Sequence, residues 1–292
     1  MLMKKNGNIS EGLIHGLFLI LGLVTVGCVL LISGYLVFSG LPAIREIGLL
    51  NFLFGKTWAP TAEVPQYGIL PFLLTSLAGT AGALLLGVPV GFFTAVYLAK
   101  LAPEWVKNLV GQAVSMLASI PSVVYGLVGM MVLVPGIRTL FGLPDGASLL
   151  AAILVLAIMI LPSIIKTSVT ALEAVPKEYE DASLALGATE EETWLRVSVP
   201  AAKSGIAAAV VMGVGRAIGE AMAVMMVAGN VANLPSSLFQ SVCFLTTAVA
   251  KEMSYASGLQ RQALFSIALV LFLFIMLLNA LLNFFLKGEK AQ

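Results

Sequence analysis

Two ionisable residues, Arg216 and Glu220, lie within one strongly apolar stretch, with GVG before the arginine and AMAVMMVAG after the glutamate. They are four residues apart, so on a helix they would share one face. A charge at mid-bilayer costs about 2.5–3.5 kcal/mol on insertion scales, so such residues are rare and usually functional. The sequence therefore singles out this pair as a candidate site.

Two interpretations of the pair stay open on the sequence alone, and they are compatible. The first is a mutual ion pair that faces the interior of a helix bundle. The second is a substrate contact, because the planar fork of a guanidinium matches an oxyanion. A neighbouring carboxylate would accept a hydrogen bond from a protonated oxyanion and repel a fully deprotonated one, which would favour phosphate over sulfate.

A second candidate site is the segment SIPSVVYG at 119–126, which also lies in an apolar stretch. Pro121 lacks an N–H and so frees a backbone carbonyl, while Ser122 and Tyr125 add hydroxyl groups. Such a break can line a pore or act as a hinge. It can equally serve helix packing alone.

A third motif is the polar segment EYEDASLALGATEEETWLRVSVP at 178–200. Gly187 can supply the left-handed residue that ends one helix. Thr189 can cap a second helix, with Glu192 three residues later in a capping box. The pattern predicts two short helices bent at Gly187, which together form a projecting knob. The alternative is an ordinary solvated loop.

The composition indicates a membrane protein as the frame for these motifs. The 292 residues are 59% hydrophobic and only 11% charged, whereas soluble domains average about 25% charged residues. The net charge of +1 gives no reason to expect nucleic-acid binding, and a single histidine, His15, excludes a His-based metal site or catalytic triad. The two cysteines, Cys28 and Cys243, form neither a disulfide framework nor a metal-site spacing.

Six apolar stretches approach the roughly 20 residues that a spanning helix needs. They lie at 13–38, 69–98, 109–134, 148–165, 201–227 and 263–286. The long connection at 231–262 has room for a short interfacial or re-entrant helix. The most charged connection, at 166–203, is the one most suited to meet water or a soluble partner.

The distribution of Lys and Arg favours two cytoplasmic termini. With that orientation the cytoplasmic set is Lys4, Lys5, Lys100, Lys107, Lys166, Lys177, Arg196, Lys203, Lys287 and Lys290. The outer set is only Arg45, Lys56, Arg138, Lys251 and Arg261.

The chain contains no G-x-x-x-x-G-K-[ST] phosphate loop, so we do not expect it to be an ATPase itself. If its transport uses ATP, another subunit must bind the nucleotide. Nothing in the sequence suggests covalent chemistry, a cofactor or a metal.

The charged loop resembles the motif of permeases of ABC importers. Asp181-Ala182-Ser183, then Gly187, then Val197-x-Val199-Pro200 stand where that family has Glu-Ala-Ala, Gly and Ile-x-Leu-Pro. The resemblance implies that the knob docks into a cytoplasmic ATPase. The residues implied in this coupling are Asp181, Ala182, Gly187, Ala188 and Pro200.

The string GRAIGEAMAV at 215–224 resembles the phosphate-specific type of oxyanion-importer permease, as do YGILP at 67–71 and SIPSVVYG. This implies an all-α type I ABC-importer fold with six spans, in a bacterial or archaeal cytoplasmic membrane. It also implies a second homologous permease in a heterodimer, two ATPase subunits and an extracytoplasmic phosphate-binding protein as partners. Residues 1–57 would be an N-terminal span and outer loop, and 58–292 the permease domain with its coupling loop at 166–203. The implied substrate pathway contains Arg216, Glu220, Ser122 and Tyr125.

Three alternatives remain. The cargo could be another oxyanion, such as sulfate or molybdate. The chain could be a secondary transporter or channel that works alone. An intramembrane enzyme is the least supported, because the predicted spans lack a cluster of His, Asp and Glu.

Overall fold

The computed structural model describes residues 7–288 and is mostly helical. Five of its described segments are long and apolar enough to cross a membrane, and there are six if one bent pair of helices is counted as a span. The prediction of an all-α membrane protein is therefore confirmed. The segments are Ile14–Ile47, Leu70–Leu101, Ser122–Phe141, Leu149–Glu173 and Gly258–Ala280, with the bent pair Glu190–Ala201 and Lys203–Gly219.

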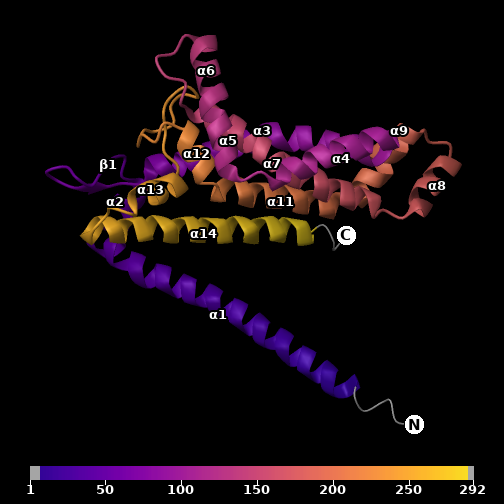
Figure 1. The fold of residues 1–292 in the computed structure, drawn as a ribbon, viewed down its shortest axis with the longest axis horizontal. Helices are drawn as coiled ribbons and strands as arrows, with labels where there is room; N and C mark the ends of the chain where they lie inside the picture. The colour runs from indigo at the N-terminus through magenta and orange to yellow at the C-terminus, as the bar shows by residue number, and fades with distance from the viewer. Residues whose placement is uncertain (1–6, 289–292) are drawn as a thin grey trace.

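Figure 1 shows the elements as one elongated bundle with a helix that diverges from it. The first half of the chain contains α1 (Gly7–Ile47), α2 (Leu49–Phe54), the hairpin of β1 (Trp58–Ala59) and β2 (Gln66–Tyr67), α3 (Leu70–Val96), the π-helical turn η1 (Tyr97–Leu101), α4 (Glu104–Ser119), α5 (Ser122–Val128), η2 (Gly129–Leu133) and α6 (Val134–Phe141). The second half contains α7 (Leu149–Glu173), α8 (Lys177–Ala185), α9 (Glu190–Thr193), η3 (Trp194–Ser198), α10 (Val199–Ala201), α11 (Lys203–Gly219), α12 (Met222–Val227), α13 (Leu245–Glu252) and α14 (Gly258–Gly288).

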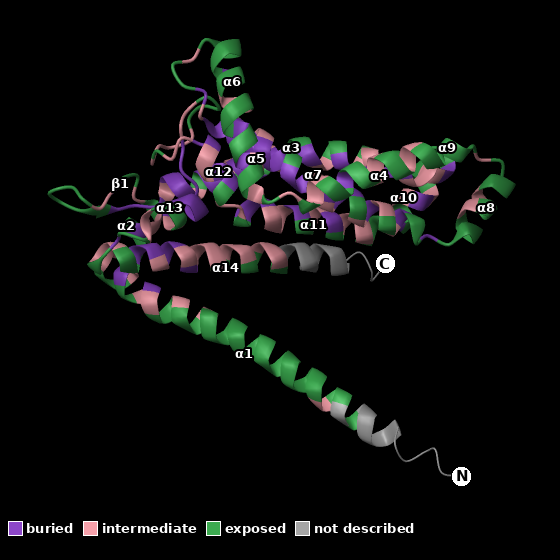
Figure 2. Ribbon diagram, in the orientation of Figure 1, coloured by how far each residue is buried: buried purple, intermediate pink, exposed green. Residues whose placement is uncertain are grey.

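The most buried spanning helix is α7, which packs against both α3 and α11 (Figure 2). Glycines make this close packing possible. A Cβ atom added at Gly91 of α3 would lie 2.8 Å from Cγ2 of Ile164, and one at Gly213 of α11 would lie 3.2 Å from Cδ1 of the same residue. Ile164 of α7 is thus held between two helices that can approach only because these positions lack side chains.

The predicted third span at 109–134 is not one helix. α4 ends at Ser119, and α5 begins at Ser122 after an extended Ile120 (ψ 128°) and Pro121 (ψ 142°). Proline has no N–H to donate and disfavours the helical region for the residue before it, so the helix breaks here. The segment long and apolar enough to span is instead Ser122–Phe141, which consists of α5, η2 and α6.

The predicted fifth span at 201–227 is also broken. α11 ends at Gly219, Glu220 is extended (φ −72°, ψ 129°), and α12 begins at Met222. The following connection contains α13, as the room in the sequence at 231–262 suggested. Non-helical backbone at this depth is tolerated only where protein or a polar cavity surrounds it, so both breaks point to the interior of an assembly.

α1 is longer than the predicted first span at 13–38, since its described part runs to Ile47. It contacts the bundle near its end, where Ser266 Oγ of α14 donates to the Gly40 carbonyl at 2.5 Å and the rings of Tyr35 and Phe265 meet edge to face. The rest of α1 is mostly exposed (Figure 2). Both the start of α1 and the end of α14 point toward the end of the bundle that carries α8 (Figure 1), as two cytoplasmic termini require. Lys4, Lys5 and Lys290 lie outside the described residues.

Candidate functional site

The two helix breaks meet in the bundle, because α5 packs directly on α12. A Cβ atom added at Gly126 would lie 2.8 Å from Cα of Ala223 and 2.9 Å from Sδ of Met226. Only glycine allows the backbones to come so close. The structure therefore brings the predicted motifs at 119–126 and 215–224 together in one junction.

The expectation that Arg216 and Glu220 share a helix face is wrong. Glu220 lies outside α11, and its Oε1 accepts a hydrogen bond from the backbone N–H of Ala223 at 3.0 Å. Its carbonyl accepts a second hydrogen bond from Thr246 Oγ1 at 2.7 Å. The first turn of a helix has N–H groups without helical partners, and a carboxylate there is stabilised by hydrogen bonds and by the helix dipole. Glu220 thus caps α12.

Arg216 remains in the last turn of α11 and is half-buried. No ion pair of the described residues includes it. The side chain is within electrostatic range of Tyr125 on the other broken span. A guanidinium with five donors and no carboxylate bound to it is available for an anion.

The structure places Tyr125 across the first break. Its hydroxyl donates at 2.7 Å to the Leu117 carbonyl in the last turn of α4, which also accepts from the Ile120 N–H at 3.3 Å. Ser122 is the first residue of α5 and is half-buried. The described residues contain no group of three or more His, Cys, Asp or Glu that could hold a metal ion.

The second candidate region is the segment from α8 to α10 (177–201), which we call the knob. Its predicted local structure is confirmed. Gly187 has a φ of +89° between α8 and α9. Thr189 Oγ1 accepts from the Glu192 N–H at 3.2 Å, and the Glu192 carboxylate accepts from the Thr189 N–H at 3.3 Å, which completes the capping box.

The outer surface of the knob is open and partly apolar. Asp181, Ala182, Gly187 and Pro200 are exposed, and Ala188 is half-buried. Leu186 is 90% exposed and Leu195 57%. Large apolar side chains that are exposed beside charged ones are typical of a protein interaction surface.

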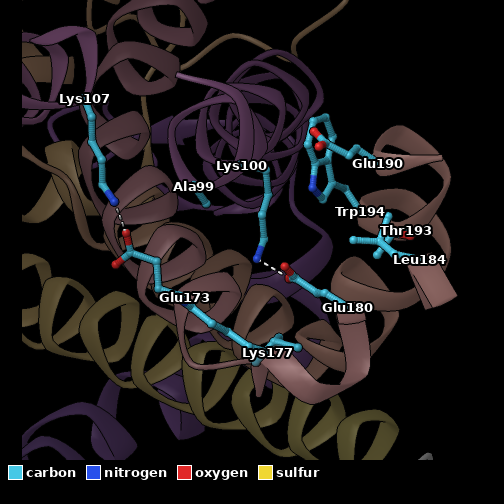
Figure 3. Close-up of a pocket in the computed structure, with 11 residues that line it drawn as sticks. Ala99, Lys100, Lys107, Glu173, Lys177, Glu180, Leu184, Glu190, Thr193 and Trp194 are labelled. Atoms are coloured by element: carbon cyan, nitrogen blue, oxygen red, sulfur yellow. Dashed lines mark hydrogen bonds and ion pairs between the residues drawn. The ribbon is translucent and has the colours of Figure 1, made fainter. Parts of the chain in front are cut away.

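Sequence reasoning missed how the knob is held to the bundle (Figure 3). Lys100 of η1 forms an ion pair with Glu180 of α8, and Ser198 Oγ of η3 donates to the same carboxylate oxygen at 2.7 Å. Burial opposes the ionisation of Glu180. The hydrogen bonds from Lys100 and Ser198 outweigh it, so the pKa of Glu180 lies below its ordinary value of 4.5.

The same region contains a second ion pair between Lys107 of α4 and Glu173 of α7 (Figure 3). The four charged residues line a cavity of about 400 Å³ between the knob and the ends of the spans. No local pattern could have revealed these pairs, because Lys100 and Glu180 are 80 residues apart and Lys107 and Glu173 are 66 apart.

Comparison with known proteins identifies close resemblances. Residues 87–288 match the family model of the binding-protein-dependent transport system inner membrane component. The probable ABC transporter permease protein YqgH of Bacillus subtilis is 39% identical, over 89% of this chain and 86% of its own length. The phosphate transport system permease protein PstC of Pasteurella multocida is 37% identical, over 82% of this chain and 79% of its own length.

Solved structures agree in fold. A chain of the MetNI methionine ABC transporter in an inward-facing conformation superposes with a TM-score of 0.56 at 20% identity, covering 76% of this chain and 94% of that one. A chain of an amino acid ABC transporter gives a TM-score of 0.55 at 21% identity, covering 75% of this chain and 92% of that one. At these identities the likeness concerns the fold alone.

Proposed function

The chain belongs to the family of binding-protein-dependent transport system inner membrane components and is a multi-pass permease subunit, and we propose that it is of the PstC type. Its cargo in this proposal is phosphate. Relatives named phosphate transport system permease protein PstC support the cargo. The observation that carries the proposal is the Arg216 guanidinium, which has no ion pair in the described chain and lies where two broken spans meet.

Arg216 would hold the phosphate oxygens through its planar fork. Glu220 keeps acceptor capacity, since a carboxylate has about four lone-pair sites and Ala223 occupies one. It would accept a hydrogen bond from a protonated phosphate and repel a sulfate dianion. Ser122 and Tyr125 complete the proposed pathway, on the facing side of the junction.

ATP hydrolysis belongs, in this proposal, to two cytoplasmic ATPase subunits on which the knob docks. Asp181, Ala182, Gly187, Ala188 and Pro200 form the coupling surface, and the exposed Leu186 and Leu195 supply apolar contacts. A second homologous permease provides the other half of the pathway, and an extracytoplasmic binding protein delivers phosphate. Residues 58–292 form the transport unit, to which 1–57 add a span and an outer loop.

Reconstitution of the complete transporter in liposomes tests the proposal. We expect uptake of labelled phosphate that requires ATP and the binding protein and is not reduced by excess sulfate or molybdate. Uptake of sulfate or molybdate in preference to phosphate would assign another oxyanion. Uptake without ATP or partner subunits would identify a transporter that works alone.

A further inference from the structure

One face of α4 is polar along its whole length. Asn108, Gln112, Ser115 and Ser119 are spaced by four, three and four residues, so they lie on one face of the helix, and all four are exposed. The hydroxyls of Ser115 and Ser119 donate to the carbonyls of Gly111 and Ser115 at 2.8 and 2.9 Å. Their oxygen lone pairs and the two side-chain amides remain available to water or solute.

This polar face opens on a groove of about 680 Å³ between α4 and α7. Its polar lining comes from Asn108, Gln112 and Ser115 of α4 and from Lys166 and Thr170 of α7. Met116 of α4 and Ile165 and Val169 of α7 are among its apolar lining residues. Lys166 is exposed there. At the cytoplasmic end of the groove the carboxylate of Glu173 is already bound by Lys107, so the charge of Lys166 dominates the wall.

A second exposed face of α4 differs sharply from the first. Leu109 is 61% exposed and follows Asn108 directly, and Ala113 is exposed and follows Gln112. Neither residue lines the groove. Apolar side chains suit a lipid surface, whereas amides and hydroxyls in hydrocarbon lose their hydrogen bonds with water. The face of Leu109 and Ala113 therefore suits lipid, whereas the groove-lining face carries the amides and hydroxyls together with the exposed Met116.

We propose that the polar face of α4, together with Lys166, forms a wall of the water-filled path by which an oxyanion leaves the junction toward the cytoplasm. The inference rests on the proposed transport function. The last turn of α4 lies at the junction, because its Leu117 carbonyl is bound by the Tyr125 hydroxyl. Tyr125 is in turn within electrostatic range of Arg216. Neutral donors and one lysine bind an anion weakly at several points, which permits release.

Single cysteine substitutions in the assembled transporter test the wall. The exposed Cys28 is replaced by serine in every variant, and the buried Cys243 is kept. Gln112→Cys and Ser115→Cys probe the polar face, and Leu109→Cys and Ala113→Cys are matched controls at similar depth. With a charged methanethiosulfonate, we expect the first two to react at least about ten-fold faster, since a charged reagent enters water and not lipid. Millimolar phosphate should slow their reaction.

Three outcomes would overturn the proposal. Equal rates at all four positions would mean that the polar face borders no water path. Protection of Gln112→Cys and Ser115→Cys both with and without ATP would identify a contact with another subunit. Rates that respond to anionic lipid in place of phosphate would identify a lipid headgroup in the groove.

Uptake measurements on Lys166 variants distinguish a failure of this inference from a failure of the cargo assignment. Lys166→Met should lower phosphate uptake several-fold, and Lys166→Arg should retain most of it, while ATP hydrolysis is measured in parallel. If the unmodified transporter does not take up phosphate, the proposed cargo is wrong whatever the labelling shows. If it does and Lys166→Met behaves normally, only the wall is wrong.

Discussion

Lys100 and Glu180 form an ion pair that joins the cytoplasmic end of the second spanning segment to the first helix of the knob. Ser198 donates to the same carboxylate from η3, so Glu180 binds both the bundle and the second half of the knob. A further hydrogen bond of 2.8 Å between Ser183 and Thr193 closes the two halves of the knob on each other. We therefore expect a displacement of the knob to reach η1 and α3 through these contacts.

This connection predicts a loss of coupling when either partner is removed. Lys100→Met or Glu180→Gln should lower phosphate uptake per ATP hydrolysed by about five-fold or more, within the usual range of coupling energies. The double exchange Lys100→Glu with Glu180→Lys should restore part of it. Lys107→Met is the matched control, because its ion pair with Glu173 is more exposed and does not involve the knob. Equal effects at both lysines would contradict the prediction.

Gly187 predicts a purely conformational effect on the knob. Its φ is +89° and a Cβ atom there would meet nothing within 4 Å, so space is not the constraint. A β-branched side chain in the left-handed region costs about 1–2 kcal/mol. Gly187→Val should uncouple ATP hydrolysis from uptake, and Gly187→Asn, which tolerates this region, should do so much less. Normal uptake by the valine variant would count against the docking role.

The junction predicts different consequences for its two charges. Arg216→Gln should reduce uptake at least about ten-fold while the complex still assembles, since hydrogen bonds from a charged group are worth about 1.5–3 kcal/mol. Arg216→Lys should be intermediate, because it keeps the charge and loses the fork. Failure of Arg216→Gln to insert or assemble would instead establish a structural role.

Glu220 is best tested with two variants in the same uptake and assembly measurements. Glu220→Gln keeps an acceptor for the Ala223 N–H, so the fold should persist while discrimination against sulfate declines. Glu220→Ala removes the cap and should cost about 1 kcal/mol of stability. Unchanged selectivity in the glutamine variant would leave Glu220 with the capping role alone.

The contact between α5 and α12 predicts a packing defect at Gly126. Gly126→Ala would place a methyl group 2.8 Å from Cα of Ala223, and overpacking of this kind typically costs about 1–3 kcal/mol. Gly136→Ala of α6 is the control, since nothing lies within 4 Å of its added Cβ atom. Thermal unfolding of the purified complex should show a lower midpoint for the first variant only.

Local features of the sequence were sufficient where the cause of a structure is local. The capping box at Thr189, the turn at Gly187 and the break at Pro121 each depend on neighbouring residues, and each motif was visible in the sequence. The break at Glu220 was not visible in the sequence. The Glu220 carbonyl, which has no helical partner at the break, is bound by Thr246, 26 residues later. The residues on both sides of this break are apolar, so hydropathy predicts one continuous span where the structure has the two helices α11 and α12.

One hydrogen bond joins two parts of the chain that the ribosome synthesises far apart in time. Ser76 Oγ in the second span accepts from the backbone N–H of Leu245, at the start of α13, across 169 residues. Ser76 is therefore inserted long before its partner exists, and Glu220 must likewise await Thr246. Neither acceptor can make its hydrogen bond to α13 until α13 has been synthesised, so the connection before α14 completes the packing of spans that precede it in the chain.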